Sequence, residues 1–170
     1  CRDWHDVQDG GVHWRRIVAH EWGTYPDVKL VYVSLSCVHC ANPACMAACP
    51  AGAIAKRPRD GVMTVDRGQC LGGDACGRCR EACPYGIPQF GARGDDRMQM
   101  CTFCADRIDA GETPVCVEAC PMRALDWGPM DELRKKYGAV PEVRGFAASP
   151  TARPSMLFRP RYRPADAGSR

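Results

Sequence analysis

Short apolar stretches separated by polar turns run along most of this chain. Residues 28–36 are rich in β-branched and aromatic types with partial alternation, so they predict a strand. Residues 53–56 and 62–65 flank Asp60-Gly61, a turn dipeptide, and predict a hairpin. Short helices are expected near residues 44–49, 79–83 and 115–120, and another over residues 130–137. No stretch approaches the roughly 18 to 20 apolar residues of a membrane-spanning helix, so no direct membrane span is expected.

The C-terminal part of the sequence has a different pattern. From residue 145 onwards it holds Pro150, Pro154, Pro160 and Pro164 with interspersed arginine, which favours extended backbone over a packed core. The segment 155–158 keeps an apolar centre. We therefore expect residues 141–170 to form an extended basic tail that docks as a strap on a partner, with disorder as the alternative.

Cysteine changes this picture most. The chain has 170 residues and 13 of them are Cys, an odd number that excludes a fully paired disulfide framework. The 23 basic and 20 acidic residues leave a net charge of +3, which is too balanced to indicate nucleic acid as a partner. We find no Gly-rich nucleotide loop and no Ser-His-Asp order, so the sequence predicts no active site of its own.

The cysteines fall into three runs that each end in Cys-x3-Cys-Pro. The first run is Cys37, Cys40, Cys45 and Cys49, the second is Cys70, Cys76, Cys79 and Cys83, and the third is Cys101, Cys104, Cys116 and Cys120. Such runs are typical of [4Fe-4S] proteins, whereas zinc sites use two separate pairs of ligands. A zinc-held interaction module therefore remains the weaker alternative.

Ligand exchange between runs follows from this chemistry. In two-cluster ferredoxins the first three cysteines of a run hold one cube, and the fourth binds the other cube. One cube would then take Cys37, Cys40, Cys45 and Cys83; a second would take Cys70, Cys76, Cys79 and Cys49; a third would take Cys101, Cys104, Cys116 and Cys1. Cys120 needs a fourth cube, whose other three ligands we expect upstream of Cys1. A lipid-bearing N-terminal Cys is the less favoured interpretation of Cys1.

Several phrases around these runs resemble the iron-sulfur electron-transfer subunit of the dimethyl sulfoxide reductase family of molybdopterin oxidoreductases. They are Ser36 to Cys45, Ala82 to Phe90, Cys101 to Cys104, Pro114 to Pro121, and Ala124 to Lys136. The resemblance extends from Cys1 to about residue 160. One departure is the five-residue gap between Cys70 and Cys76, where the family usually has two residues.

This resemblance implies a non-catalytic subunit with four [4Fe-4S] clusters, three of which the given chain can complete. It implies a molybdopterin catalytic subunit and a quinol-linked integral membrane anchor as partners, and membrane association only through them. The corresponding subunit of a formate dehydrogenase or of a tetrathionate or polysulfide reductase is the alternative. A stand-alone redox enzyme would need a substrate pocket that the sequence does not indicate.

The expected fold class is α+β, with tandem ferredoxin-like domains made of short helices and β-hairpins. Residues 1–36 would be a remnant of an N-terminal ferredoxin-like half, and residues 96–140 its second part. Residues 37–95 would form an inserted domain with two cluster-binding runs, followed by the tail at 141–170. His39, between Cys37 and Cys40, is expected to pack or hydrogen-bond near a cluster sulfur. His5, His13 and His20 are expected to be surface or packing residues.

Overall fold

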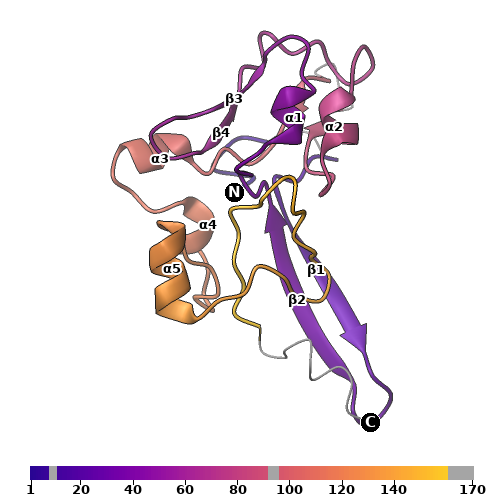
Figure 1. The fold of residues 1–170 in the computed structure, drawn as a ribbon, viewed down its shortest axis with the longest axis vertical. Coiled ribbons are helices and arrows are strands. Elements are labelled where there is room, and N and C mark those ends of the chain that lie inside the picture. The colour runs from indigo at the N-terminus through magenta and orange to yellow at the C-terminus, as the bar shows by residue number, and fades with distance from the viewer. Residues whose placement is uncertain (8–10, 92–95, 161–170) are drawn as a thin grey trace.

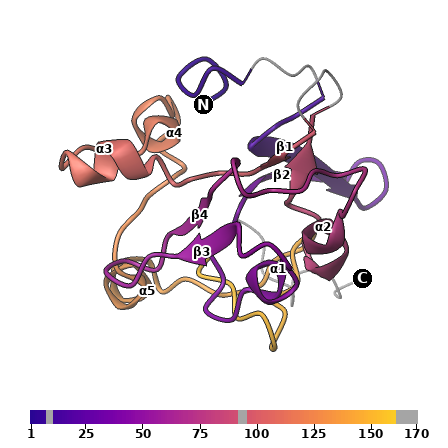
Figure 2. The ribbon, with the colours of Figure 1, turned by 90° about the horizontal axis from the view of Figure 1, so that it is seen from above.

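The computed structural model describes residues 1–7, 11–91 and 96–160 of the chain. Within these residues it is an α+β fold of small two-stranded antiparallel sheets and short helices, shown in Figures 1 and 2. The strands are β1 (Arg15–Trp22), β2 (Lys29–Ser36), β3 (Ile54–Lys56), β4 (Met63–Val65), β5 (Gln89–Phe90) and β6 (Met98–Gln99). The helices are α1 (Ala44–Ala47), α2 (Arg78–Ala82), α3 (Ala105–Asp109), α4 (Val115–Glu118) and α5 (Met130–Tyr137).

The elements expected from the hydrophobic pattern are present, with shifted ends. Strand β2, the β3–β4 hairpin and helix α5 are confirmed, and α1, α2 and α4 are shorter than expected or shifted by one residue. Strand β1 was not predicted, because Arg15, Arg16 and Glu21 interrupt its apolar pattern. It forms because β2 supplies a continuous partner, with Val18 opposite Val33 at the centre of the register.

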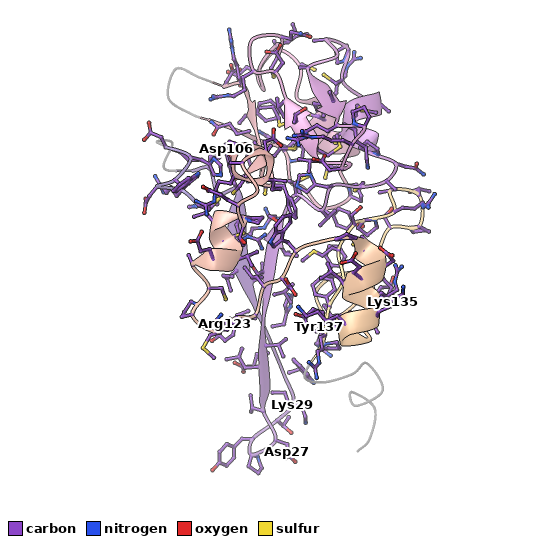
Figure 3. The ribbon with its side chains drawn as sticks, turned by 90° about the vertical axis from the view of Figure 1, so that its left-hand side faces the viewer. Asp27, Lys29, Asp106, Arg123, Lys135 and Tyr137 are labelled. Carbon is purple, nitrogen blue, oxygen red and sulfur yellow. The ribbon has the colours of Figure 1, made fainter. Side chains whose placement is uncertain are left out.

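The β1–β2 hairpin projects from the body of the molecule (Figure 1). Asp27 and Lys29 mark its far end in Figure 3. Ile17 and Tyr32 face solvent, with 61% and 67% of their surface exposed, whereas Val33 is buried. The hairpin thus has an outer face open to solvent and an inner face that packs on the rest of the protein.

One apolar core lies between the first two cysteine runs. It contains Ile54 and Met63 from the β3–β4 hairpin and Met98 from β6, together with Cys79, Ile87 and Met100. Cys37, Cys45, Cys49, Cys70 and Cys83 pack against this core. The first and second runs, far apart in sequence, therefore share one hydrophobic centre.

Residues 144–158, here called the strap, dock on the same chain. The Phe146 ring stacks on Tyr85 with centroids 4.9 Å apart, and Phe158 lies 5.1 Å from Phe146. Backbone hydrogen bonds join Ser155 N–H to the Val38 carbonyl, and Ala41 N–H to the Arg153 carbonyl. The sequence predicted that this segment docks on a partner. In the structure its aromatic side chains pack on the same chain instead. Residues 161–170 of the expected tail lie outside the described residues.

The strap should contribute measurably to stability through Phe146, which is 5% exposed. We expect Phe146→Ala to lower the free energy of unfolding by about 3 kcal/mol, because a buried ring is lost and a cavity remains. Anaerobic denaturant unfolding followed by tryptophan fluorescence measures this change. Tyr32→Ala on the exposed hairpin face is the control, with a loss below about 1 kcal/mol. Equal losses in the two variants would contradict the docking of the strap.

Candidate metal centres

The first ligand group joins cysteines of two different runs. The pKa of the Cys45 thiol is raised to about 11, first by burial and then by the charge of the Cys83 thiolate. Burial raises the pKa of the Cys40 thiol as well, and Cys83 is again its next largest cause. Helices α1 and α2, which bring these segments together, lie side by side in Figures 1 and 2. The structure therefore brings Cys83 of the second run to the cysteines of the first.

The second ligand group surrounds a small apolar cavity. Its lining includes Cys49 from the first run together with Cys70, Cys76 and Cys79 from the second. Ile54, Val65, Phe90 and Met98 complete much of the wall. Burial raises the pKa of the Cys79 thiol to about 11, and the charges of Cys70 and Cys49 raise it further. Four thiols around an apolar space fit the donor set of a [4Fe-4S] cube.

This cavity also bears on the extra residues between Cys70 and Cys76. Within the gap, Leu71 is 58% exposed and Gly72 adopts a positive φ of 91°. Cys70 nevertheless lines the cavity, and its sulfur accepts a hydrogen bond from the Met98 N–H at 3.4 Å. Leu71 and Gly72 also line the cavity, so the longer gap runs along its wall and Cys70 stays beside the other three thiols.

The third ligand group is the most buried one. Cys101 and Cys104 are 7% and 4% exposed, and burial raises the pKa of both thiols. The Phe103 N–H donates to the Cys101 sulfur at 3.4 Å. The Cys116 thiolate raises the pKa of both Cys101 and Cys104, so Cys116 lies near them. The structure thus brings together the three cysteines of this run that were expected to share a cube.

The N-terminal turn lies against this third group. The Arg107 guanidinium stacks over the Trp4 ring at 4.5 Å, and the His5 Nε2 lies 3.3 Å from the Cys104 sulfur. Cys1 itself is exposed. His5 was expected to be a surface or packing residue, and its contact with a ligand sulfur was not foreseen. Only its place four residues after Cys1 could have indicated it.

Cys120 has surroundings of its own: none of the causes that shift the pKa of its thiol is another cysteine. Its sulfur accepts a hydrogen bond from the Ala124 N–H at 3.3 Å, and this bond is the largest cause that lowers the pKa of its thiol. A wide surface depression beside it is lined by Arg107, Arg123, Asp126 and Tyr137, among others. Arg123 and Tyr137 are labelled in Figure 3. The polar lining distinguishes this region from the apolar cavity of the second group.

Fixed positive charges accompany the cysteines of two groups. The Lys56 ammonium donates to the Cys40 carbonyl at 2.5 Å and lowers the pKa of the Cys40 thiol. The charge of Arg15 lowers the pKa of the Cys101 thiol, and the charge of Arg107 lowers that of the Cys104 thiol. Arg107 follows Cys104 by three residues, so its place beside this thiol could be expected from the sequence. Lys56 and Arg15 were not identified as partners of Cys40 and Cys101, because no local spacing links them. Positive charge near a cluster stabilises its anionic form.

The four histidines have distinct surroundings. His39 is 7% exposed, and its Nδ1 accepts a hydrogen bond from the Met63 N–H at 2.9 Å. Burial, followed by the charge of Lys56, lowers the pKa of His39 to about 4. His20 packs against the backbone of Gly145, where φ is 86° and a side chain would collide with the imidazole. The His13 N–H donates to the Gln89 side chain at 2.8 Å.

Features of other site types are missing from the described residues. No three Cys, His, Asp or Glu side chains there converge closely enough to hold a single metal ion. No helix within the same part of the sequence is long and apolar enough to cross a membrane.

Comparison with known proteins agrees with the cysteine pattern. A family model described as a 4Fe-4S dicluster domain matches residues 28–130. The corresponding subunit of anaerobic dimethyl sulfoxide reductase from Escherichia coli K12 is 40% identical over an alignment of 168 residues, which covers 94% of this chain and 79% of the relative. This chain is a member of that family of iron-sulfur subunits. The resemblance inferred from the motifs is thereby confirmed.

Other members of the family extend the comparison. The equivalent subunit of anaerobic dimethyl sulfoxide reductase from Haemophilus influenzae is 37% identical over 169 residues, covering 94% of this chain and 80% of the relative. A sulfite dehydrogenase subunit from Allochromatium vinosum is 35% identical over 160 residues, covering 89% of this chain and 65% of the relative. The names of these relatives assign them to oxidoreductases that act on different substrates.

The ligand groups lead to a test of exchange between runs. We expect Cys83→Ser to weaken or abolish the same electron paramagnetic resonance signal as Cys45→Ser, since the two residues would serve one cube. Cys49→Ser should instead affect the signal that Cys79→Ser affects. The measurement is the spectrum of each dithionite-reduced variant in the assembled complex. Pairing of Cys83 with Cys79, and of Cys49 with Cys45, would contradict the exchange.

Proposed function

We propose that this chain is the electron-transfer subunit of a molybdopterin oxidoreductase complex. In this role it holds up to four [4Fe-4S] clusters, of which the given residues can complete three. It relays electrons between a quinol-linked membrane anchor and a catalytic subunit such as that of dimethyl sulfoxide reductase. The observation that carries the proposal is the cavity lined by Cys49 of one run and Cys70, Cys76 and Cys79 of the next.

Two other ligand sets complete the proposal. Cys37, Cys40, Cys45 and Cys83 form one set, and Cys101, Cys104, Cys116 and Cys1 form another. The mutual charge effects among Cys40, Cys45 and Cys83 support the first set. Contacts of Trp4 and His5 with the third run support the inclusion of the N-terminal turn in the set that contains Cys101. Cys120 belongs to a fourth set, whose remaining ligands we place upstream.

The neighbourhood of the thiols suggests that the clusters are arranged in series. The Cys79 thiolate raises the pKa of Cys45, so the second group adjoins the first. The Cys101 thiolate raises the pKa of Cys37, so the first group also adjoins the third. The first group is therefore central in the proposed relay. A [4Fe-4S] cluster supplies one-electron chemistry, and the protein sets its potential through hydrogen bonds, burial and charge.

The proposed partners follow from the family. The relatives are named as single subunits of reductases and dehydrogenases, and we infer that this chain likewise works with a separate catalytic subunit. We place it at the membrane through its partner subunits alone. The dimethyl sulfoxide reductase relative matches 94% of this chain and the sulfite dehydrogenase relative 89%, and this greater coverage favours the former type of complex.

Metal analysis tests the cofactor directly. The chain purified without oxygen should contain about twelve iron atoms and about twelve acid-labile sulfides, because each of three completable cubes holds four of each. It should be brown and give a spectrum of reduced [4Fe-4S] clusters. Zinc in a colourless protein without sulfide would instead show an interaction module held by zinc.

Removal of the iron should unfold the protein. The core is small, and binding of metal to several thiolates supplies folding free energy in proteins of this kind. We expect an iron chelator, added after oxidation of the clusters, to abolish the cooperative unfolding transition seen by circular dichroism. A folded, cooperatively melting apoprotein would contradict this dependence.

A further inference from the structure

His39 and Phe103 occupy the same position in two sister loops. His39 follows Cys37 by two residues and precedes Cys40, and Phe103 stands in the same relation to Cys101 and Cys104. Both adopt a positive φ, 42° for His39 and 57° for Phe103. The backbone N–H of each donates to the sulfur of the first cysteine in its loop. The two loops are therefore built alike and differ in the side chain at this position.

The two side chains meet at the junction between the first and third ligand groups. The His39 and Phe103 rings pack edge to face, with centroids 5.2 Å apart and planes 70° apart. The Cys37 and Cys101 thiols beside them are close enough for the charge of one to raise the pKa of the other. His39 thus lies between the first and third ligand groups.

The imidazole of His39 has one buried donor without a partner. Its Nδ1 accepts the Met63 N–H, so the neutral ring carries its proton on Nε2. Within the part of the sequence that the structure describes, Nε2 is buried and has no hydrogen-bond partner. Buried donors are nearly always satisfied, and each exception calls for an explanation. An acceptor that is absent from the polypeptide itself would supply one.

We propose that His39 donates its Nε2–H to a sulfur atom of one of the two clusters that flank it, and thereby raises the reduction potential of that cluster. This inference rests on the proposed function, since it requires [4Fe-4S] clusters in the first and third groups. A hydrogen bond to sulfur stabilises the more negative, reduced form more than the oxidised form. His39 acts as a positioning and tuning residue, while Phe103 fills the equivalent place without a donor.

Two variants remove the donor in different ways. His39→Phe copies the sister loop, where a phenyl ring already fits the same backbone conformation. His39→Asn keeps a side-chain oxygen to accept the Met63 N–H, but its shorter amide does not reach the position of Nε2. In His39→Phe the Met63 N–H loses its acceptor, which can destabilise the protein. His39→Asn keeps an acceptor for that N–H and therefore still tests the proposal.

The measurement is a redox titration of the assembled complex, followed by electron paramagnetic resonance. Single Cys→Ser variants at Cys45 and Cys116 assign the signals of the two flanking clusters. We expect both His39 variants to keep the full iron and sulfide content. The reduction equilibrium of one flanking cluster should shift about tenfold towards the oxidised form, which is about 59 mV for one electron. The cluster of Cys49, Cys70, Cys76 and Cys79 should keep its potential.

Phe103→Leu is the matched control, because it alters the same ring contact without removing a donor. An equal shift in this variant would mean that packing sets the potential, and the proposal would be wrong. Unchanged potentials in His39→Phe and His39→Asn, with all clusters present, would also overturn it. Wild-type protein without iron and sulfide would instead refute the proposed function itself, so the two failures are distinguishable.

Discussion

In the account proposed above, the structure depends on the sharing of thiolates between segments that are distant in sequence. Cys49 lies in the first run but lines a cavity with Cys70, Cys76 and Cys79, and Cys83 of the second run lies near Cys40 and Cys45. With the proposed ligand sets, each run needs a cysteine from the other. The packing of α1 against α2 and the common core around Met63 and Met98 bring the two runs together, as the proposed exchange requires.

Other parts of the polypeptide pack on the cysteine loops. The strap covers the first loop, where its backbone bonds to Val38 and Ala41, and its Phe146 stacks on Tyr85 just after Cys83. Lys56 and Arg15 reach the same region from β3 and β1, and bring positive charge to buried thiols. Burial raises the pKa of these thiols and opposes their ionisation. Nearby cations and backbone N–H groups lower the pKa and offset part of this effect.

The sequence allowed the cysteine runs and the β3–β4 hairpin to be predicted better than their surroundings. Spacing is a local property, so the three runs and the β3–β4 turn at Asp60-Gly61 could be found without a structure. Strand β1 could not be predicted, because its charged residues interrupt the apolar pattern and its pairing with β2 is a contact between separate segments. The roles of Lys56, Arg15 and His5 were missed for a related reason, since each contact joins residues that no motif spacing connects. The docking of the strap on its own chain likewise depends on where Tyr85 lies.

Iron-edge anomalous diffraction from crystals of the assembled complex tests the sharing of thiolates most directly. It locates each iron atom and therefore the cluster to which each cysteine sulfur is bonded. Our account predicts that the Cys83 sulfur is bonded to the same cluster as Cys37, Cys40 and Cys45. A Cys83 sulfur bonded to the cluster of its own run, with Cys70, Cys76 and Cys79, would contradict it.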